Sequence, residues 1–312
     1  MKVSYKVPAT SANIGPGFDC LGMALPVYNI VTIEETTAPA KNLNINLMND
    51  IENAIETNID NITRDNSNIV YRAVEELYGM VGRDVGNISI SIQTGIPVAR
   101  GLGSSASVIV GGLLAANDIL GNPADEAAML SIATEIEGHP DNVVPAILGG
   151  LVFSSMQDDG SILYKKLNWC EDWIITVCVP DFELPTSISR SVLPKSVSMD
   201  DAIFNSKCLS MLIHAIDTKD TNLMKYALQD KLHQPYREKL ITGFKEIKNA
   251  FKYNETVLGT VISGAGPSIL VISKNDNLEN IKNVVKTTWD ELNVSSIIKS
   301  MPIEQHGAIK IQ

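Results

Sequence analysis

The stretch GLGSSAS, residues 101–107, combines residue types that bind phosphate. Gly101 and Gly103 let backbone N–H groups approach an anion closely, and Ser104 and Ser105 follow where a helix is expected to begin. The exposed N–H groups and the positive dipole end of such a helix attract phosphate. Since a glycine signature alone is weak, a plain strand-to-helix turn capped by serine is the alternative interpretation. The stretch also lacks the lysine of a Walker A loop, so another positive charge has to neutralise a bound triphosphate.

A phosphate loop of this kind needs a strand before it and a helix after it, and the sequence predicts both. Residues 87–97, NISISIQTGIP, alternate between apolar and polar side chains and predict a half-buried strand. Residues 105–120 predict a buried helix that stops at Gly121 and Pro123. The loop therefore has the flanking elements that its chemistry requires.

Other elements of the first half are predicted from the same patterns. An amphipathic helix over 67–80 opens on Ser67 or Asn68 as its cap, and a helix over 124–137 carries acids in its first turn. The GHPDN stretch that follows predicts a polar turn. The N-terminal residues begin as an alternating strand that is expected to break at Pro8.

The second half has a different pattern. A buried strand is predicted over 172–182, followed by helices near 199–216 and 220–230. A strand–glycine turn–strand unit over 256–273 and a helix over 278–292 come next, before a final strand. We predict a domain boundary near residue 152, with domains over 1–152 and 153–312, and a fold of the α/β or α+β class.

Composition excludes several classes of protein. The 312 residues are 45% hydrophobic and 20% charged, which is typical of a globular protein. The net charge is -11 with no run of basic residues, which argues against a nucleic-acid partner. The N-terminus has no apolar core of a signal peptide, and the longest apolar stretch, 108–116, is too short to span a bilayer. The four cysteines show no metal-binding spacing. We expect a cytoplasmic protein with reduced thiols and no membrane contact.

Three motifs together resemble the GHMP kinases, the family named for galactokinase, homoserine kinase, mevalonate kinase and phosphomevalonate kinase. PVARGLGSSA, residues 97–106, resembles the ATP motif of that family. PATSANIGPGFDCLGMAL, residues 8–25, resembles its N-terminal motif, and VISGAGPSILV, residues 261–271, resembles its third motif. Each of the last two is also compatible with a simple turn. Three motifs in the family's order, across nearly the whole chain, are more specific than any one of them.

The resemblance implies a fold and a nucleotide. The fold is the α+β two-domain GHMP kinase fold, with a ribosomal protein S5 domain 2-like N-terminal domain and a ferredoxin-like C-terminal domain. ATP is expected between the two domains. The residues that match the family's ATP-binding positions are Pro97, Val98, Ala99, Arg100, Gly101, Leu102, Gly103, Ser104, Ser105, Ala106, Ser107, Gly264 and Gly266.

The resemblance also implies Mg²⁺ as the missing positive charge. Mg²⁺ prefers hard oxygen ligands and keeps several waters and phosphate oxygens, so one hydroxyl and one carboxylate from the protein suffice. By resemblance these come from Ser105 and Glu137. Glu135 is the competing carboxylate, and its position two residues earlier puts it on a different face of a helix.

The phosphate acceptor is indicated by three further segments, which resemble the homoserine kinases within this family. They are EGHPDNVVPAILGG at 137–150, LPTSISRSVLP at 184–194 and QDKLHQPYREKLI at 229–241. Homoserine is a zwitterion with a primary hydroxyl, so its site has to pair one carboxylate and one ammonium. The substrate-binding residues that the resemblance implies are Asn13, Asp19, His139, Asp141, Arg190 and Arg237.

The catalytic residues implied by the resemblance are Arg190, Thr186 and Asn142. No motif fixes a catalytic base, which a loose phosphoryl transfer does not require because positioning and charge neutralisation do most of the work. A homodimer is expected from the family. Alternatives remain: Arg237 could pair with Asp230 or Glu238 at the surface, and Asn142 could only cap the segment after it. The protein could also phosphorylate another small alcohol, such as shikimate or mevalonate, or sense nucleotides without catalysis.

Overall fold

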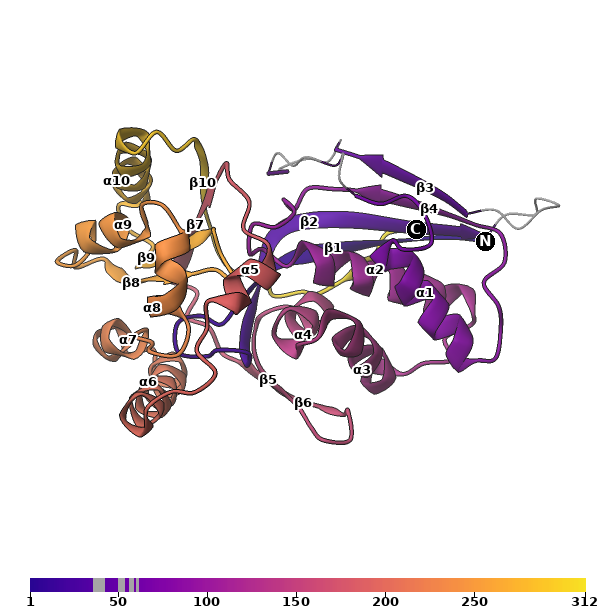
Figure 1. Cartoon of the computed structure of the whole chain (residues 1–312), viewed down its shortest axis with the longest axis horizontal. Helices are drawn as coiled ribbons and strands as arrows, with labels where there is room; N and C mark the ends of the chain where they lie inside the picture. The colour runs from indigo at the N-terminus through magenta and orange to yellow at the C-terminus, as the bar shows by residue number, and fades with distance from the viewer. Residues whose placement is uncertain (36–42, 50–53, 56–58, 60–61) are drawn as a thin grey trace.

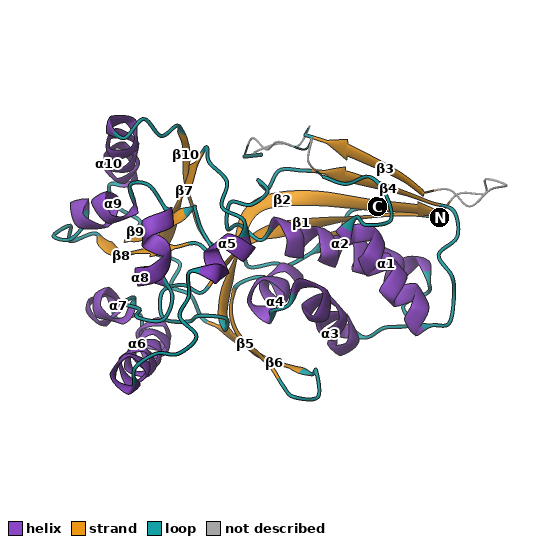
Figure 2. Ribbon diagram, viewed as in Figure 1, coloured by secondary structure: helices purple, strands orange, loops and turns teal. Residues whose placement is uncertain are grey.

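The computed structural model describes residues 1–35, 43–49, 54–55, 59 and 62–312, which form two sheets side by side with helices packed against them (Figure 1). The first sheet and helices α1–α4 make one half of the molecule, and the second sheet with helices α6–α10 makes the other. Helix α5 (Thr186–Ser191) lies between the two halves (Figure 2).

The first sheet has seven strands among the described residues. Its main path runs β11-β1-β2-β4-β3, and β5 pairs with the beginning of β2 and with β6. The strands are β1 (Lys2–Ala12), β2 (Leu21–Glu35), β3 (Leu43–Met48), β4 (Ile88–Gln93), β5 (Leu151–Met156), β6 (Ile162–Leu167) and β11 (Ile309–Lys310). Among the strands that the structure describes, only β3 and β4 pair in parallel. Successive side chains of a strand point to opposite faces, so β4 turns Ile88, Ile90 and Ile92 to the core, as the sequence pattern predicts.

Four helices cover one face of this sheet and bury its apolar side (Figure 2). They are α1 (Ile69–Met80), α2 (Ser104–Ile119), α3 (Glu126–Glu137) and α4 (Pro140–Leu148). Of the two predicted caps of α1, Asn68 is the one used, and its side chain accepts a hydrogen bond from the Val70 amide. Asp125, expected in the first turn of α3, is instead its N-cap and accepts from the Ala128 amide. Helix α2 packs directly against β1 and β2, where Gly111 gives room for Val31 and Val7.

The second sheet is antiparallel and has the order β10-β7-β9-β8. Its strands are β7 (Trp173–Pro180), β8 (Val257–Ile262), β9 (Ile269–Lys274) and β10 (Ser296–Met301). Around it lie α6 (Met199–Thr218), α7 (Thr221–Ala227), α8 (Gln234–Arg237), a 3₁₀ turn (Glu238–Leu240), α9 (Phe244–Ala250) and α10 (Leu278–Glu291). The sequence of β7 is an almost continuous apolar run rather than an alternation of apolar and polar residues. This agrees with the structure, in which every side chain of β7 is buried.

The two halves share part of one apolar core. Ile14, in the loop after β1, and Leu21, the first residue of β2, belong to the same buried cluster as Trp173, Val177 and Leu270 of the second sheet. The loop between β1 and β2 is thereby held at the junction of the halves. That junction is where a ligand bound by both halves has to lie.

The domain boundary that the sequence predicts near residue 152 stays a prediction. The strand pairing shows that the first sheet continues through β5 and β6 to Leu167, and that β11 returns to it from the C-terminus. The chain enters the second sheet at Trp173.

Two local expectations were wrong. Strand β1 does not break at Pro8: the pairing with β2 shifts between Pro8 and Ala9, and such an irregularity accommodates the missing N–H of proline. The GHPDN stretch is not only a turn, because α4 already begins at Pro140, whose fixed φ suits the first helical position. No helix among the described residues is long and apolar enough to cross a membrane.

Candidate active site

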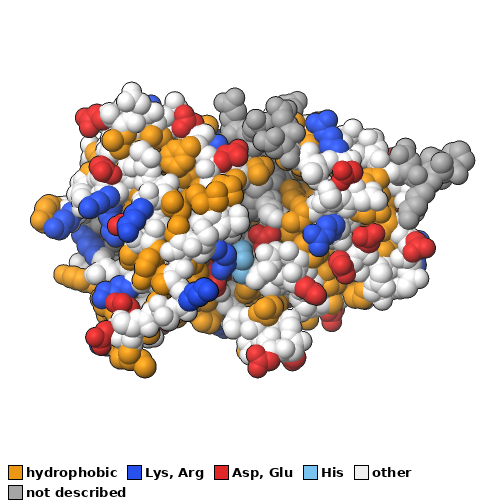
Figure 3. All heavy atoms as spheres, in the orientation of Figure 1, with side chains coloured by type: hydrophobic (Ala, Val, Ile, Leu, Met, Phe, Trp, Pro, Cys, Tyr) orange, Lys and Arg blue, Asp and Glu red, His pale blue; other side chains and the backbone are white. Residues whose placement is uncertain are grey.

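One cavity collects nearly all of the candidate residues at the junction of the two halves. Figure 3 shows the molecule hollowed there, with charged side chains and a histidine beside the hollow. The cavity is lined by Ala12, Asn13, Asp19, Pro97, Val98, Ala99, Arg100, Gly101, Leu102, Gly103, Ser104, Ser105, Glu137, His139, Asp141, Asn142, Thr186, Arg190, Arg237, Gly264 and Ala265. Segments far apart in the sequence thus share one site.

The glycine-rich loop forms one wall of the cavity and depends on its glycines. Gly101 and Gly103 have φ values of 70° and 65°, in the left-handed region that favours glycine. A Cβ on Gly101 would lie 2.2 Å from the carbonyl oxygen of Ser263, and one on Gly103 would lie 1.9 Å from Oγ1 of Thr10. Gly103 is also the N-cap of α2. Because glycine has no side chain to accept their hydrogen bonds, the backbone N–H groups of the first turn are not capped from this position.

Some residues of the predicted ATP motif do not face the cavity. Ala106 and Ser107 are fully buried, and the Ser107 hydroxyl accepts a hydrogen bond from Asn29. Gly266 is not among the lining residues. Arg100 lines the cavity, but its guanidinium donates to the carbonyl oxygens of Pro180 and Asp181, at 3.1 and 2.8 Å. Its side chain therefore fastens the loop to the second half rather than pointing to a phosphate.

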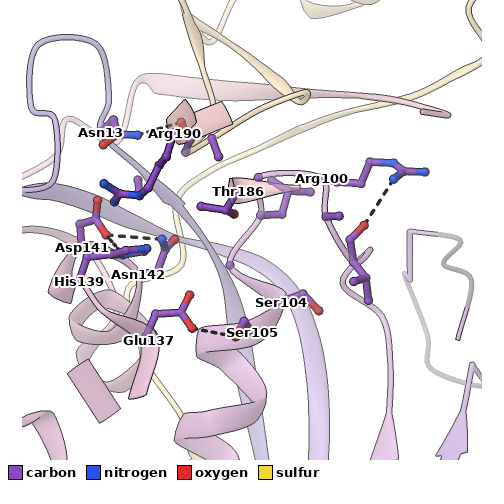
Figure 4. A pocket seen from close by; sticks show the side chains of 18 of the residues that line it. Asn13, Arg100, Ser104, Ser105, Glu137, His139, Asp141, Asn142, Thr186 and Arg190 are labelled. Carbon is purple, nitrogen blue, oxygen red and sulfur yellow. Dashed lines mark hydrogen bonds and ion pairs between the residues drawn. The ribbon is translucent and has the colours of Figure 1, made fainter. Parts of the chain in front are cut away.

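Ser105 and Glu137 meet at the start of α2. The Ser105 hydroxyl donates to Oε2 of Glu137 at 2.7 Å, a contact seen in Figure 4. Burial raises the pKa of the Glu137 carboxyl, and the Ser105 hydrogen bond and the His139 charge offset only part of this. Glu135 is exposed and lines a different cavity. Of the two competing carboxylates, only Glu137 is placed beside the loop.

The hydroxyl of Ser105 and the carboxylate of Glu137 fit Mg²⁺ by chemistry. They are hard oxygen donors, and a metal that also binds phosphate oxygens needs few protein ligands. No group of three or more histidine, cysteine or acidic side chains among the described residues forms a complete metal cage. This donor set therefore fits a metal that arrives with the nucleotide.

A polar network lies at the start of α4, on the wall of the cavity (Figure 4). His139 Nδ1 lies 2.6 Å from Oδ1 of Asp141, and the buried Thr10 hydroxyl donates to Oδ1 of Asn142 at 2.8 Å. Burial lowers the pKa of His139, but the hydrogen bond and charge of Asp141 and the charge of Glu137 outweigh it, so that the pKa is raised. Asp141 is 1% exposed, which leaves its carboxylate engaged with neighbours rather than with solvent.

Asn13 and Asp19 hold the loop between β1 and β2 against the second half. The Asn13 amide donates to the Gly264 carbonyl at 2.8 Å, and its Oδ1 accepts the Asp19 backbone N–H at 3.0 Å. The Asp19 carboxylate is paired in turn with both terminal nitrogens of Arg190, at 2.8 and 3.2 Å. Asp19 and Arg190, both expected to bind the substrate, therefore bind each other in this structure.

Arg237 is buried at the back of the cavity, with 1% of its surface exposed. Nε donates to the Ser189 carbonyl at 3.3 Å, and Nη1 donates to the Gly264 carbonyl at 3.1 Å. Burial is the main cause that lowers the pKa of Arg237 to about 10, and the charge of the neighbouring Arg190 lowers it further. The alternative of a surface ion pair with Asp230 or Glu238 was wrong, because Arg237 is buried and its three hydrogen bonds run to two backbone carbonyls and a histidine.

Thr186 begins α5 and lines the cavity on the same side as Arg190 (Figure 4). Its hydroxyl side chain is exposed, and the figure shows it between Arg190 and the loop. The hydroxyl is thus available to a group bound between these two elements.

Sequence reasoning missed two features of the site. A second, largely apolar cavity adjoins the loop on its other side and shares Val98, Ser104 and Ser105 with the first. Its other lining residues are Ile62, Thr63, Ser67, Asn68, Ile69, Val70, Ile92, Thr94 and Val108.

The second feature is Phe18, whose ring lies 5.1 Å from the His233 ring and 5.8 Å from the Arg190 guanidinium. The only available signal was the position of Phe18 next to Asp19 in a recognised motif.

Two family models match the chain. The GHMP kinases N terminal domain matches residues 68–150, and the GHMP kinases C terminal model matches residues 212–291. The first match includes the glycine-rich loop, Glu137 and the start of α4, and the second includes Arg237 and the β8–β9 turn.

Similar proteins extend over the full length of the chain. A homoserine kinase of Crocosphaera subtropica is 40% identical over 306 residues, covering 98% of this chain and 96% of that protein. One of Trichormus variabilis is 39% identical, covering 98% of both. The crystal structure of homoserine kinase from Cytophaga hutchinsonii superposes with a TM-score of 0.87 at 28% identity, covering 99% of this chain and 97% of that one.

Proposed function

The chain belongs to the GHMP kinases and is a kinase, and from this premise we propose that it transfers the γ-phosphoryl group of ATP to the hydroxyl of L-homoserine. The product, O-phospho-L-homoserine, leads toward threonine. One observation carries the choice of acceptor: two arginines and one aspartate, Arg190, Arg237 and Asp19, line the cavity that faces the glycine-rich loop. Two cations and one anion match the carboxylate and the ammonium of an amino acid next to a triphosphate.

The nucleotide is assigned to the two adjoining cavities. The phosphates lie along the loop and the start of α2, where backbone amides and the helix dipole favour negative charge. The base occupies the apolar cavity on the other side of Val98 and Ser104, since bases are bound by apolar walls with a few polar groups. Ser105 and Glu137 hold Mg²⁺, which when bound neutralises phosphate charge.

L-Homoserine lies between the arginines and the loop. Arg237 is anchored through Nε and Nη1, whereas its Nη2 has no hydrogen-bond partner among the described residues and is left for the carboxylate. Asp19 pairs with the ammonium group, and His139 lies across the cavity at the start of α4. Binding then exchanges contacts within the Asp19–Arg190 pair for contacts with the zwitterion, which supplies both charges.

In the transfer, the homoserine hydroxyl oxygen forms a bond to the γ-phosphorus while the bond between that phosphorus and the bridging oxygen of ADP breaks. Arg190 stabilises charge on the transferring group, and the hydroxyl of Thr186 and the amide of Asn142 orient it. The hydroxyl proton passes to a γ-phosphate oxygen or to a water. We assign Asp141 to holding His139, whose Nδ1 lies 2.6 Å from its Oδ1, rather than to removal of the hydroxyl proton.

The variant Asp141→Asn tests this proton path. If Asp141 only organises His139 and Asn142, the variant keeps measurable turnover and changes the KM for homoserine together with kcat. Complete loss of turnover with unchanged homoserine binding, measured by calorimetry, would instead identify Asp141 as the catalytic base.

The proposed activity is tested first by ADP release from ATP and Mg²⁺ with L-homoserine, shikimate, mevalonate, L-threonine or no acceptor. Turnover that depends on homoserine supports the proposal. Turnover with a different alcohol keeps the assignment of the loop and overturns that of the acceptor residues. ATP binding without turnover with any acceptor favours a nucleotide sensor.

We further propose that the enzyme acts in the cytoplasm as a homodimer. The first proposal is checked by fractionating the source cells, and recovery with membranes argues against it. Light scattering of the purified chain checks the second, and a monomer at all working concentrations contradicts it.

A further inference from the structure

His233 lies directly behind Arg237 and is 0% exposed. It precedes α8 by one residue, so it is one helical turn from Arg237 and on the same side of the helix. Its Nε2 lies 2.8 Å from the carbonyl oxygen of Gly15, and its Nδ1 lies 3.3 Å from Nη1 of Arg237. The imidazole therefore bridges the loop between β1 and β2 and the guanidinium that borders the cavity.

The partners of the ring fix its protonation. A guanidinium nitrogen has only N–H donors, so the contact with Arg237 requires an unprotonated Nδ1 that accepts. A carbonyl oxygen only accepts, so Nε2 carries the proton and donates to Gly15. A doubly protonated ring would set two donors against each other and two cations side by side. Burial lowers the pKa of His233, which agrees with a neutral ring; Asp230 opposes this shift and Arg237 reinforces it.

The surroundings hold the imidazole in this orientation. The Asp230 carboxylate accepts the backbone N–H groups of Leu232, His233 and Gln234, at 2.9, 3.0 and 2.7 Å. It thereby fixes the backbone of His233, while its Oδ2 stays 3.6 Å from Nε2. The Phe18 ring stacks on the imidazole at a centroid distance of 5.1 Å and an interplanar angle of 17°. Its distance of 5.2 Å from the Arg237 guanidinium also places it in cation–π range.

We propose that His233 is a positioning residue that, as the neutral Nε2–H tautomer, orients Arg237 toward the acceptor and ties it to the Gly15 turn. The proposal rests on the proposed function, because it takes the carboxylate of L-homoserine as the ligand of Arg237. Nη1 is fully used by Gly264 and His233, and Nε by Ser189, so the guanidinium plane is fixed and Nη2 is aimed by the three contacts together. The same imidazole holds the turn that precedes Asp19.

Steady-state kinetics of His233→Leu and His233→Gln test this role. Leucine removes both hydrogen bonds and leaves a buried donor of Arg237 and the Gly15 carbonyl without partners, and we expect the KM for homoserine to rise about tenfold or more. Glutamine restores most of the loss, because its amide oxygen accepts from Arg237 while its amide nitrogen donates to Gly15. The KM for ATP stays within about twofold in both, since the phosphate loop is not touched. His214→Gln, at an exposed position of α6, is the matched control and leaves both KM values unchanged.

Three results would overturn the proposal. They are an unchanged KM for homoserine in His233→Leu, an equal rise of the KM for ATP, and a His233→Gln variant no better than His233→Leu. Absence of homoserine-dependent turnover in the wild-type enzyme is a separate result that refutes the proposed function itself. The two failures are therefore distinguishable.

Imidazole nitrogen NMR of the wild-type enzyme tests the proposal without relying on a variant that folds. The chain has four histidines, so the signal of His233 is assigned by elimination with glutamine variants of His139, His214 and His306. We expect a protonated Nε2 and an unprotonated Nδ1 at neutral pH. A proton on Nδ1, with or without one on Nε2, contradicts the assignment.

Discussion

The two walls of the cavity are built in different ways. The wall that we propose for the phosphates, called the phosphate wall, is a single stretch, Pro97–Ser105, in which the backbone would bind the ligand and the glycines allow a close approach. The acceptor wall takes Asp19 from the β1–β2 loop, Arg190 from α5 and Arg237 from α8, and each of these acts through its side chain. One wall is therefore local in sequence and the other exists only after both halves have folded together.

The difference has an energetic consequence. A backbone site is sensitive to added atoms, since a Cβ on Gly101 collides with the Ser263 carbonyl oxygen and one on Gly103 with the Thr10 hydroxyl. A side-chain site is sensitive to lost or misdirected hydrogen bonds, as each buried charge relies on fixed partners. Variants of the two walls should accordingly impair the binding of different ligands.

Gly101→Ala is expected to have the largest effect and to fall on ATP. Its new Cβ meets the Ser263 carbonyl oxygen at 2.2 Å, so the loop has to move and we expect ATP affinity to fall at least about 100-fold. Gly82→Ala is the control: Gly82 has a similar φ of 67°, but a Cβ there meets nothing within 4 Å. Both variants carry backbone strain of about 1 kcal/mol, seen in thermal unfolding, while calorimetry separates them by ATP affinity. Equal ATP affinities in the two would show that close approach is not what the loop requires.

Arg237→Lys should break the other wall and spare ATP. Lysine cannot reproduce the three guanidinium contacts to Ser189, Gly264 and His233, so we expect the KM for homoserine to rise by about 30-fold and the KM for ATP by less than about twofold. Arg72→Lys, at an exposed position of α1, controls for the substitution itself. A rise in the KM for ATP alone would place Arg237 on the nucleotide side.

Glu137→Gln sharpens the assignment of the metal ligand. If Glu137 binds Mg²⁺, the variant needs more Mg²⁺ for half-maximal rate and loses about tenfold in kcat/KM, because a neutral amide is a weaker ligand than a carboxylate. Glu135→Gln should leave Mg²⁺ titrations unchanged, since Glu135 is exposed and lines a different cavity. The reverse order of effects would transfer the role to Glu135.

The smallest expected effect concerns the His139–Asp141 pair, which lines the same cavity as both walls, and it is an effect of pH on stability. The pKa of His139 is raised in the folded protein, so the pair contributes fully below the unfolded value of about 6.5 and its contribution is lost as pH rises through the folded value. His139→Gln should therefore lower the free energy of unfolding more at pH 6 than at pH 9, by a difference of about 1 kcal/mol or less, which thermal unfolding at the two pH values measures. A deficit that grows toward pH 9 would mean that the neutral ring is the stabilising form.

Much of the phosphate wall was predictable because its signals are local. The strand, the glycines and the helix follow one another within residues 88–119, and the caps of α1 and α3 come from residues beside them. The start of α4 at Pro140 was also a local signal, which the polar GHPDN composition concealed. The family resemblance supplied the acceptor residues, yet it gave no geometry for them.

What the sequence determined by itself is the set of groups: a glycine loop with a helix behind it, hydroxyl and carboxylate donors, and a family with its fold. Tertiary structure alone decided which groups meet. It placed Glu137, but not Glu135, at the cavity. It turned the Arg100 side chain away to the carbonyl oxygens of Pro180 and Asp181 and paired Asp19 with Arg190. It also placed His233 and Phe18 behind Arg237. The physical reason is that backbone conformation depends mainly on neighbours in the chain, whereas the charge partners and burial of a side chain depend on segments that only folding brings together.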